Sequence, residues 1–246
     1  MKSILPAIGL LGISLIFLVA ANSAAAQSFE FNVERERTLR DQTGKLVITP
    51  DRIEYQTPRK GELRVWCYNE LREIKVLAPA RIELHSYEDR KRMLGADIVY
   101  KFKLLDGEIT PELSALLLAK SPRPPALSVL PEKSGDAVFV VPVKHLHRFG
   151  GCLGALKIYA DRIVYEADGE RADSRYWRYR DVQSFSQSER FRFELLGFEE
   201  DFGGAKAYNF QLREELPAGA YDFIWQRVYP LKFHSRPVRA SQYRER

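Results

Sequence analysis

Apolar and polar residues alternate in short runs along most of the chain, and this two-residue period is typical of half-buried β-strands. Phe29, Phe31 and Val33 share one face of the first run, and Leu46 and Ile48 share one face of the second. Further alternating runs follow as far as residue 104. The pattern predicts six or seven short strands in the first part of the chain.

A helix is predicted directly after these strands. Thr110 is a suitable N-cap and Pro111 a suitable first helical residue, and Leu113, Leu116 and Leu117 form one apolar stripe. A stripe of the same spacing follows Pro217 near the end of the chain and comprises Ala220, Phe223, Ile224, Arg227 and Val228. The chain thus contains two groups of strands, each followed by one helix.

The two groups arise from an internal duplication. Residues 44–55 and 154–165 share Gly, Leu, Ile, Asp, Arg, Ile and Tyr at seven of twelve aligned positions. Further matches occur in the same order: Phe29 and Val33 with Phe139 and Val143, Arg64, Trp66 and Tyr68 with Arg175, Trp177 and Tyr179, 82–84 with 193–195, and 100–104 with 208–212. Matches in one order indicate a repeated domain.

The duplication fixes the expected domain organisation. We predict a mainly β (α+β) fold of two tandem small β-barrels, each closed by a C-terminal α-helix, over residues 27–121 and 137–232. Residues 122–136 between them are rich in Pro and polar residues, which predicts a semi-rigid linker. Residues 233–246 form a basic tail, which is either solvated or in contact with an anionic membrane surface.

The first 26 residues have the pattern of a secretory signal peptide. Lys2 precedes an uncharged, mostly apolar run over residues 4–21, and Ala24 and Ala26 fit an A-x-A cleavage site before Gln27. The apolar run is long enough that an uncleaved membrane anchor is the alternative. We therefore expect an exported protein, periplasmic or secreted, of a bacterial cell envelope.

Composition limits the function more than it defines it. The net charge is +5, and removal of residues 1–26 takes away one Lys and no acid, which leaves 37 − 33 = +4. This mild charge has no concentrated basic stripe apart from the tail, so we expect no nucleic-acid partner. The run 175–180 interleaves arginines with aromatic residues, and we expect it to be a core strand whose Arg178 and Arg180 point outward. The acidic run 199–201 is interpreted as a loop.

One cluster has metal-ligand character. His145 and His147 point the same way on a strand, and Cys152 follows a glycine turn, a donor set that suits zinc or copper. His85 or His234 would be a fourth ligand. The alternatives are ordinary surface or packing histidines, or a catalytic Cys–His pair.

The first copy has Arg35, Arg37 and Gln42 at the aligned positions, so the fold itself does not require metal ligands. Cys67 and Cys152 are the only cysteines. In an oxidising compartment they would form a disulfide between the two copies, and the alternative is two separate free thiols.

The repeated pattern resembles the pleckstrin-homology superfold, and it is most similar to the GRAM-like and bacterial versions. The resembling features are Gly-x-Leu-x-Ile, a tight turn, Asp-Arg-Ile-x-Tyr, and Trp-x-Tyr followed by an acid and an aliphatic residue. The resemblance implies a barrel that binds proteins, peptides or lipids without catalysis. The phosphoinositide site is not carried over, because only Arg52 or Arg162 lies beside the short first turn.

Three functions follow as expectations. The first is a non-catalytic scaffold that binds an envelope protein or peptide. The second is a carrier or sensor of a lipid or small apolar ligand, which the large inward residues disfavour. The third is a metal-binding protein that uses His145, His147 and Cys152. The sequence contains no Gly-rich phosphate loop, metalloprotease motif or Gly-x-Ser-x-Gly elbow, so we expect no enzyme and no cofactor beyond a possible zinc or copper ion.

Overall fold

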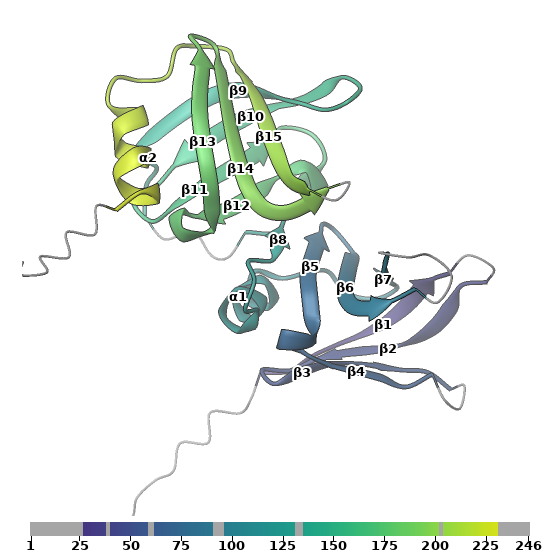
Figure 1. Ribbon diagram of the computed structural model, residues 1–246. Helices are drawn as coiled ribbons and strands as arrows, with labels where there is room; N and C mark the ends of the chain where they lie inside the picture. The colour runs from purple at the N-terminus through teal and green to yellow at the C-terminus, as the bar shows by residue number, and fades with distance from the viewer. Residues whose placement is uncertain are drawn as a thin grey trace, which may run out of the picture.

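The computed structural model describes residues 27–37, 40–58, 62–90, 96–130, 135–201 and 204–230 (Figure 1). Two mainly antiparallel sheets follow one another along the chain, and an α-helix follows the seventh strand of each. The predicted mainly β fold of two tandem domains is therefore confirmed. The expected signal peptide over residues 1–26 and the basic tail over 233–246 lie outside the described residues.

The first domain contains an eight-stranded sheet in the order β4-β3-β2-β1-β7-β6-β5-β8. Its strands are β1 (Phe29–Glu36), β2 (Gln42–Ile48), β3 (Arg52–Gln56), β4 (Arg64–Cys67), β5 (Leu71–Leu77), β6 (Arg81–Asp89), β7 (Asp97–Leu104) and β8 (Ala126–Leu127). The helix α1 (Pro111–Lys120) starts where the sequence predicts, because Thr110 Oγ1 accepts a hydrogen bond from the Leu113 N–H.

The second domain repeats this arrangement with a seven-stranded sheet in the order β12-β11-β10-β9-β15-β14-β13. Its strands are β9 (Phe139–Leu146), β10 (Gly151–Ile158), β11 (Arg162–Ala167), β12 (Arg175–Arg178), β13 (Val182–Glu189), β14 (Arg192–Asp201) and β15 (Gly204–Leu212). The helix α2 (Ala220–Val228) follows. Both domains thus pair their first seven strands in the same order, as a duplicated fold requires. In Figure 1 the second sheet curls so that β13 and β14 lie in front of β9, β10 and β11.

The shared Gly and Tyr of the repeated motif are explained by one contact. A Cβ at Gly44 would lie 2.5 Å from the Gln56 carbonyl oxygen and 2.5 Å from the Tyr55 ring. Only glycine leaves room for this ring, whose hydroxyl donates to the Gln42 carbonyl at 3.2 Å. In the second domain the ring of Tyr165 lies against Gly154, and its hydroxyl donates to the Cys152 carbonyl at 2.9 Å.

The second shared Tyr also has a backbone partner in each copy. Tyr68 lies in the 3-10 turn η1 (Tyr68–Glu70) and donates to the Thr49 carbonyl at 2.7 Å. Tyr179, in the 3-10 turn η3 (Tyr179–Asp181), donates to the Tyr159 carbonyl at 2.6 Å. Each bond ties the end of the Trp-x-Tyr strand to the tight turn between the second and third strands of its domain, β2–β3 or β10–β11.

Each domain has its own filled core. In the first domain the inward residues include Leu46, Ile48, Ile53 and Tyr55, which have no exposed surface, and Trp66, which is nearly buried. The second core is built from the matching positions, including Leu156, Ile158, Ile163, Tyr165 and Trp177. Large side chains therefore occupy the interior of both sheets, as the sequence predicted.

Two local predictions are wrong. Ala126–Leu127, expected in the linker, forms β8, which pairs in parallel with Lys75 and Val76 of β5. The first domain therefore extends beyond residue 121, because Leu127 and Val129 complete its core. The run 199–201 is not a loop. It forms the end of β14, where Glu200 and Asp201 pair with β15 and Glu200 contacts Lys75 and Glu73 of the first domain.

No helix among the described residues is long and apolar enough to cross a membrane.

Candidate functional site

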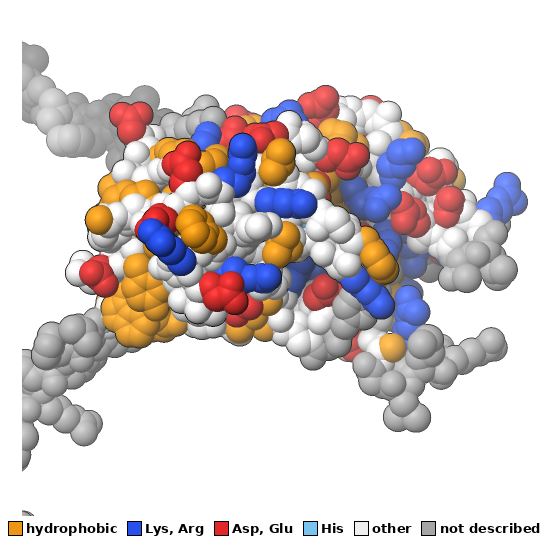
Figure 2. All heavy atoms as spheres, turned by 90° about the horizontal axis from the view of Figure 1, so that it is seen from above, with side chains coloured by type: hydrophobic (Ala, Val, Ile, Leu, Met, Phe, Trp, Pro, Cys, Tyr) orange, Lys and Arg blue, Asp and Glu red, His pale blue; other side chains and the backbone are white. Residues whose placement is uncertain are grey.

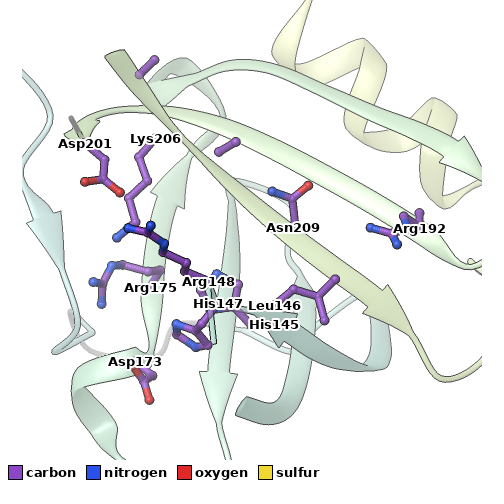
Figure 3. A pocket seen from close by; sticks show the side chains of 12 residues that line it. His145, Leu146, His147, Arg148, Asp173, Arg175, Arg192, Asp201, Lys206 and Asn209 are labelled. Atoms are coloured by element: carbon purple, nitrogen blue, oxygen red, sulfur yellow. The ribbon is translucent and has the colours of Figure 1, made fainter. Parts of the chain in front are cut away.

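A polar hollow of about 790 Å³ opens at one end of the second sheet, beside the first domain (Figure 3). Its walls come from the end of β9, the residues before and in β12, and strands β14 and β15. It is lined by His145, Leu146, His147, Arg148, Asp173, Arg175, Arg192, Asp201, Ala205, Lys206, Ala207 and Asn209. Basic side chains outnumber acidic ones in this lining, so the hollow presents a cationic wall.

His145 belongs to the aromatic core and is not among the donors that the structure brings within reach of one another. The β9–β10 register places it opposite Cys152, but its ring is only 6% exposed and packs within 5.2–5.4 Å of Tyr165, Tyr208 and Phe210. Burial, together with the nearby His147, Lys206 and Arg175, lowers the pKa of His145 to about 4. The imidazole is therefore neutral near pH 7.

His147 and Cys152 are brought together as predicted, and the structure adds Asp173. The thiol of Cys152 donates to Asp173 Oδ2 at 3.0 Å. One donor atom from each of His147, Cys152 and Asp173 lies within 4.8 Å of the others. The expected triad of His145, His147 and Cys152 is thus corrected to His147, Cys152 and Asp173.

Asp173 carries no signal in the sequence that would have singled it out. It lies in a charged loop that forms the 3-10 turn η2 (Arg171–Asp173), and only this turn carries it to the β9–β10 hairpin. Hydrogen bonding to Asp173 and burial raise the pKa of the Cys152 thiol to about 11. Such a thiol is protonated at neutral pH and is a poor nucleophile, which argues against a catalytic Cys–His pair.

The other expected partners lie elsewhere. His85, on β6, is close to Glu73 and Glu83 of the first domain, and His234 lies outside the described residues. Cys67 and Cys152 are both free in the structure, which agrees with the alternative of two separate thiols and not with the disulfide. Cys67 faces solvent on the edge strand β4, as its place after Trp66 predicts, whereas Cys152 lies in the second sheet beside Asp173.

Arg175, which lines the hollow, belongs to a triad of Arg, Tyr and Glu whose other two members, Tyr208 and Glu199, are buried behind it. Arg175 Nε donates to the Tyr208 hydroxyl at 3.0 Å and lies 3.5 Å from Glu199 Oε2, and Tyr208 donates to the same carboxylate. Burial opposes ionisation of Glu199, yet Arg175, Lys206, the Tyr208 hydrogen bond and Lys75 together hold its pKa at about 2. Arg175 points inward, and the expectation that Arg178 points outward is wrong, because its side chain is 19% exposed and bonds to Asp181 and the Leu118 carbonyl. Only Arg180, which follows the end of β12 and is 73% exposed, has the solvated position that the sequence predicts.

The first domain contains the same Arg–Tyr–Glu arrangement at the equivalent positions. In the first domain Tyr100 donates to Glu88 at 3.0 Å, and Arg64 lies 3.4 Å from the same carboxylate. The difference is exposure, since the Arg64 and Glu88 side chains are 45% and 40% exposed and those of Arg175 and Glu199 are 10% and 6% exposed. The second triad is buried because the first domain packs next to it.

An aromatic patch lies at the other side of the second domain, between β13 and α2. We define it by Phe185, Tyr221, Trp225 and Tyr229. Phe185 lies 5.0 Å from Tyr221 and 6.0 Å from Tyr229, and Trp225 lies 4.6 Å from Tyr229, measured between ring centroids. Trp225 is 48% exposed. Figure 2 shows hydrophobic side chains gathered on the side where Figure 1 places α2.

No protein-family model matches the chain, and no curated protein matches it. Solved structures do match. One chain, from a structure described as "Structure of the Spt16D Pob3N heterodimer", is 11% identical, and the match covers 71% of this chain and 84% of that chain with a TM-score of 0.29. An identity and a TM-score this low leave the ligand and partner of the present chain open.

Proposed function

We propose that the protein is a non-catalytic scaffold of two pleckstrin-homology-like domains that binds an extended peptide segment of a partner protein along the edge of β13. The shared strand order and the C-terminal helix of both domains support the pleckstrin-homology-like interpretation. The single observation that carries the binding mode is the β8–β5 pair, because it demonstrates strand addition at this edge of the fold.

The equivalent strands β5 and β13 differ in whether their outer edge is paired. In the first, Lys75 and Val76 of β5 pair with Ala126 and Leu127 of β8. The duplication aligns Lys75 with Ser186, since Lys75 pairs with Glu83 and Ser186 with Glu194 at the same offset. Within the part of the chain that the structure describes, β13 pairs only with β14 and ends the sheet. Its outer backbone groups are therefore available to a strand from another molecule.

The sequence of β13 favours such use. Edge strands are usually protected from pairing by Lys, Pro or inward charges. Residues 182–188 contain no charge and no Pro, only Val, Gln, Ser and Phe. The aromatic patch next to this edge offers apolar contacts for alternate side chains of an added strand, which would supply specificity.

The alternative carrier function has less support. Both cores are filled by large side chains, and the hollow of the second domain is lined mostly by polar groups, so an apolar ligand lacks an apolar cavity. Charges of both signs are interspersed on the face in Figure 2, which supports a protein rather than a nucleic-acid partner. We place the scaffold in the bacterial envelope, exported by residues 1–26, with membrane contact through the basic tail as an additional proposal.

A displayed library of random peptides tests the binding mode. Peptides enriched on the purified protein should bind at least tenfold more weakly to two variants. Gln187→Pro removes the backbone N–H of an edge residue that has no partner in the β13–β14 register. Trp225→Ala removes the exposed ring of the aromatic patch. The control is Phe149→Ala, which removes an 86% exposed ring on the distant β9–β10 turn.

Equal binding to all three variants would reject the β13 edge as the binding site. Failure to enrich any peptide above an unrelated protein would reject the peptide-binding function itself.

A further inference from the structure

We propose that His147, Cys152 and Asp173 bind a divalent metal ion of the zinc class in the second domain. This site is separate from the β13 edge and does not rest on the proposed function. It differs from the cluster that the sequence suggests, because Asp173 replaces His145. The proposal rests on the convergence of three donors, on their chemistry and on a comparison between the two copies of the fold.

Three separate segments bring the donors together. His147 follows the last residue of β9 and Cys152 is the second residue of β10, so the tight turn between the strands sets their separation. In that turn Gly150 has a φ of +80°, and the His147 N–H donates to its carbonyl at 3.3 Å. A Cβ at Gly151 would collide with the His145 carbonyl oxygen, so the turn depends on glycine at both positions.

The donor set suits zinc. Imidazole nitrogen, thiolate sulfur and carboxylate oxygen are its three usual ligand types. With metal–ligand bonds of about 2.0–2.3 Å in a tetrahedron, ligand atoms lie roughly 3.3–3.8 Å apart. Cys152 Sγ and Asp173 Oδ2 are already 3.0 Å apart, and no pair exceeds 4.8 Å. The His147 ring is exposed and lies 4.4 Å from the His145 ring, measured between centroids.

The first domain shows what the fold does at these positions without metal ligands. Arg37, Gln42 and Glu62 occupy the places of His147, Cys152 and Asp173. Arg37 Nη1 lies 3.2 Å from Glu62 Oε1 and 3.5 Å from Gln42 Oε1. One cation thus joins the hairpin to the loop before β4. In the second domain a bound metal ion would take the place of that guanidinium.

The nearby arginine does not fill this role. Arg175 directs its guanidinium at Tyr208, Glu199 and the carbonyls of Ala172 and Ser174. The cationic residues of the hollow do affect the site, because Arg148, Arg175 and Lys206 reduce its attraction for a cation. They favour instead a fourth ligand that is water, hydroxide or an anion, since three protein ligands leave one position open towards the hollow.

Cobalt titration tests the site with a spectroscopic readout. The full chain, freed of metal by a chelator under reducing conditions, should bind one Co²⁺ per chain and develop thiolate-to-cobalt charge-transfer absorption that Zn²⁺ then removes. Cys152→Ser should abolish this absorption. His147→Ala and Asp173→Asn should each weaken Zn²⁺ binding at least tenfold in calorimetry. Cys67→Ser and His85→Gln are the matched controls and should leave stoichiometry and affinity unchanged.

Circular dichroism of each variant confirms that it is folded, and Cys152→Ala is the second variant if the serine variant is not. Charge-transfer absorption that survives in the Cys152 variants but disappears in Cys67→Ser would overturn the proposal. So would the absence of Zn²⁺ binding at micromolar metal in the folded parent chain, or equal affinity in the His147 and Asp173 variants.

Discussion

The ammonium group of Lys75 donates a hydrogen bond to the backbone carbonyl of Glu200 at 3.0 Å and so joins β5 of the first domain to the end of β14 in the second. The contact is reciprocated, because the Glu200 N–H donates to Glu73 Oε1 at 3.2 Å. Arg72 and Arg123 lie 3.3 Å and 3.2 Å from the Glu200 carboxylate. This is a polar interface, in which charged groups of one domain compensate those of the other.

Replacing Lys75 by Met should uncouple the two domains. Its side chain is 14% exposed and lies 3.4 Å from Glu73 Oε2 and 3.5 Å from Glu199 Oε1. Removal of the ammonium group leaves the nearly buried carboxylates of Glu73 and Glu199 with less positive charge beside them. We expect this change to lower the free energy of unfolding by on the order of 3 kcal/mol. Hydrogen exchange should become faster in β5 and in the end of β14. Lys45→Met, which removes an exposed ion pair with Glu30, is the control and should cost less than about 1 kcal/mol.

Glu199→Gln should lower the free energy of unfolding at neutral pH, and the difference from the parent chain should disappear at acidic pH. Arg175, Lys206 and Lys75 overcome the burial of Glu199 and hold its pKa at about 2, below the ordinary value of 4.5. A carboxyl with a lowered pKa stabilises the fold above about pH 4.5 and ceases to do so as the pH falls through 2. The difference between parent and variant, measured by urea denaturation, should be about 3 kcal/mol at pH 7 and should shrink between pH 4.5 and pH 2.

Glu88→Gln is the matched control, because Glu88 holds the same place in the exposed triad of the first domain. We expect it to cost less than about 1 kcal/mol at pH 7. Equal costs for the two variants would contradict the role assigned to burial at the domain interface.

Gly44→Ala and Gly154→Ala should each destabilise the domain in which they lie. A methyl group at either position meets a neighbouring carbonyl oxygen and the ring of Tyr55 or Tyr165, so we expect overpacking to cost about 1–3 kcal/mol. Gly169→Ala and Gly204→Ala are controls, since a Cβ there meets nothing within 4 Å. Exchange measured peptide by peptide should show faster opening in β2–β3 for the first variant and in β10–β11 for the second. Uniform effects across both domains would contradict the assignment.

The duplication made the fold predictable. Its repeated residues are those with strict requirements, such as the glycine under a tyrosine ring and the tyrosines that bind a carbonyl in the opposite turn. Where the two copies differ, the sequence pattern predicted the local structure less well. Acidic residues at 199–201 are typical of a loop, but Glu200 and Asp201 pair with Ala205 and Gly204 of β15, and Glu200 also contacts the first domain. The aromatic surroundings of His145 come from β11 and β15, and no spacing within β9 could reveal them.

The site was predictable only within the hairpin. His147 and Cys152 are joined by a short turn, so their proximity follows from the register of two adjacent strands. Asp173 enters through a loop between β11 and β12, and its position depends on a turn that has no recognisable sequence signal. Long-range placement of this kind follows from tertiary packing and is inaccessible to local patterns.

Ser128→Ala should loosen the segment that adds β8 to the first sheet. The Ser128 hydroxyl accepts from the Ala78 N–H at 2.6 Å and donates to the Val76 carbonyl at 3.0 Å, and the residue is buried. Loss of the hydroxyl leaves the buried Ala78 N–H without its acceptor, which lowers the free energy of unfolding by about 1–3 kcal/mol. The control is Ser114→Ala, because the buried Ser114 hydroxyl has no partner among the described residues and its loss should be nearly neutral. Exchange in residues 74–78 should accelerate in the first variant alone. Unchanged exchange there would show that β8 is held by its apolar contacts and would remove the support that strand addition in the first domain gives to binding at β13.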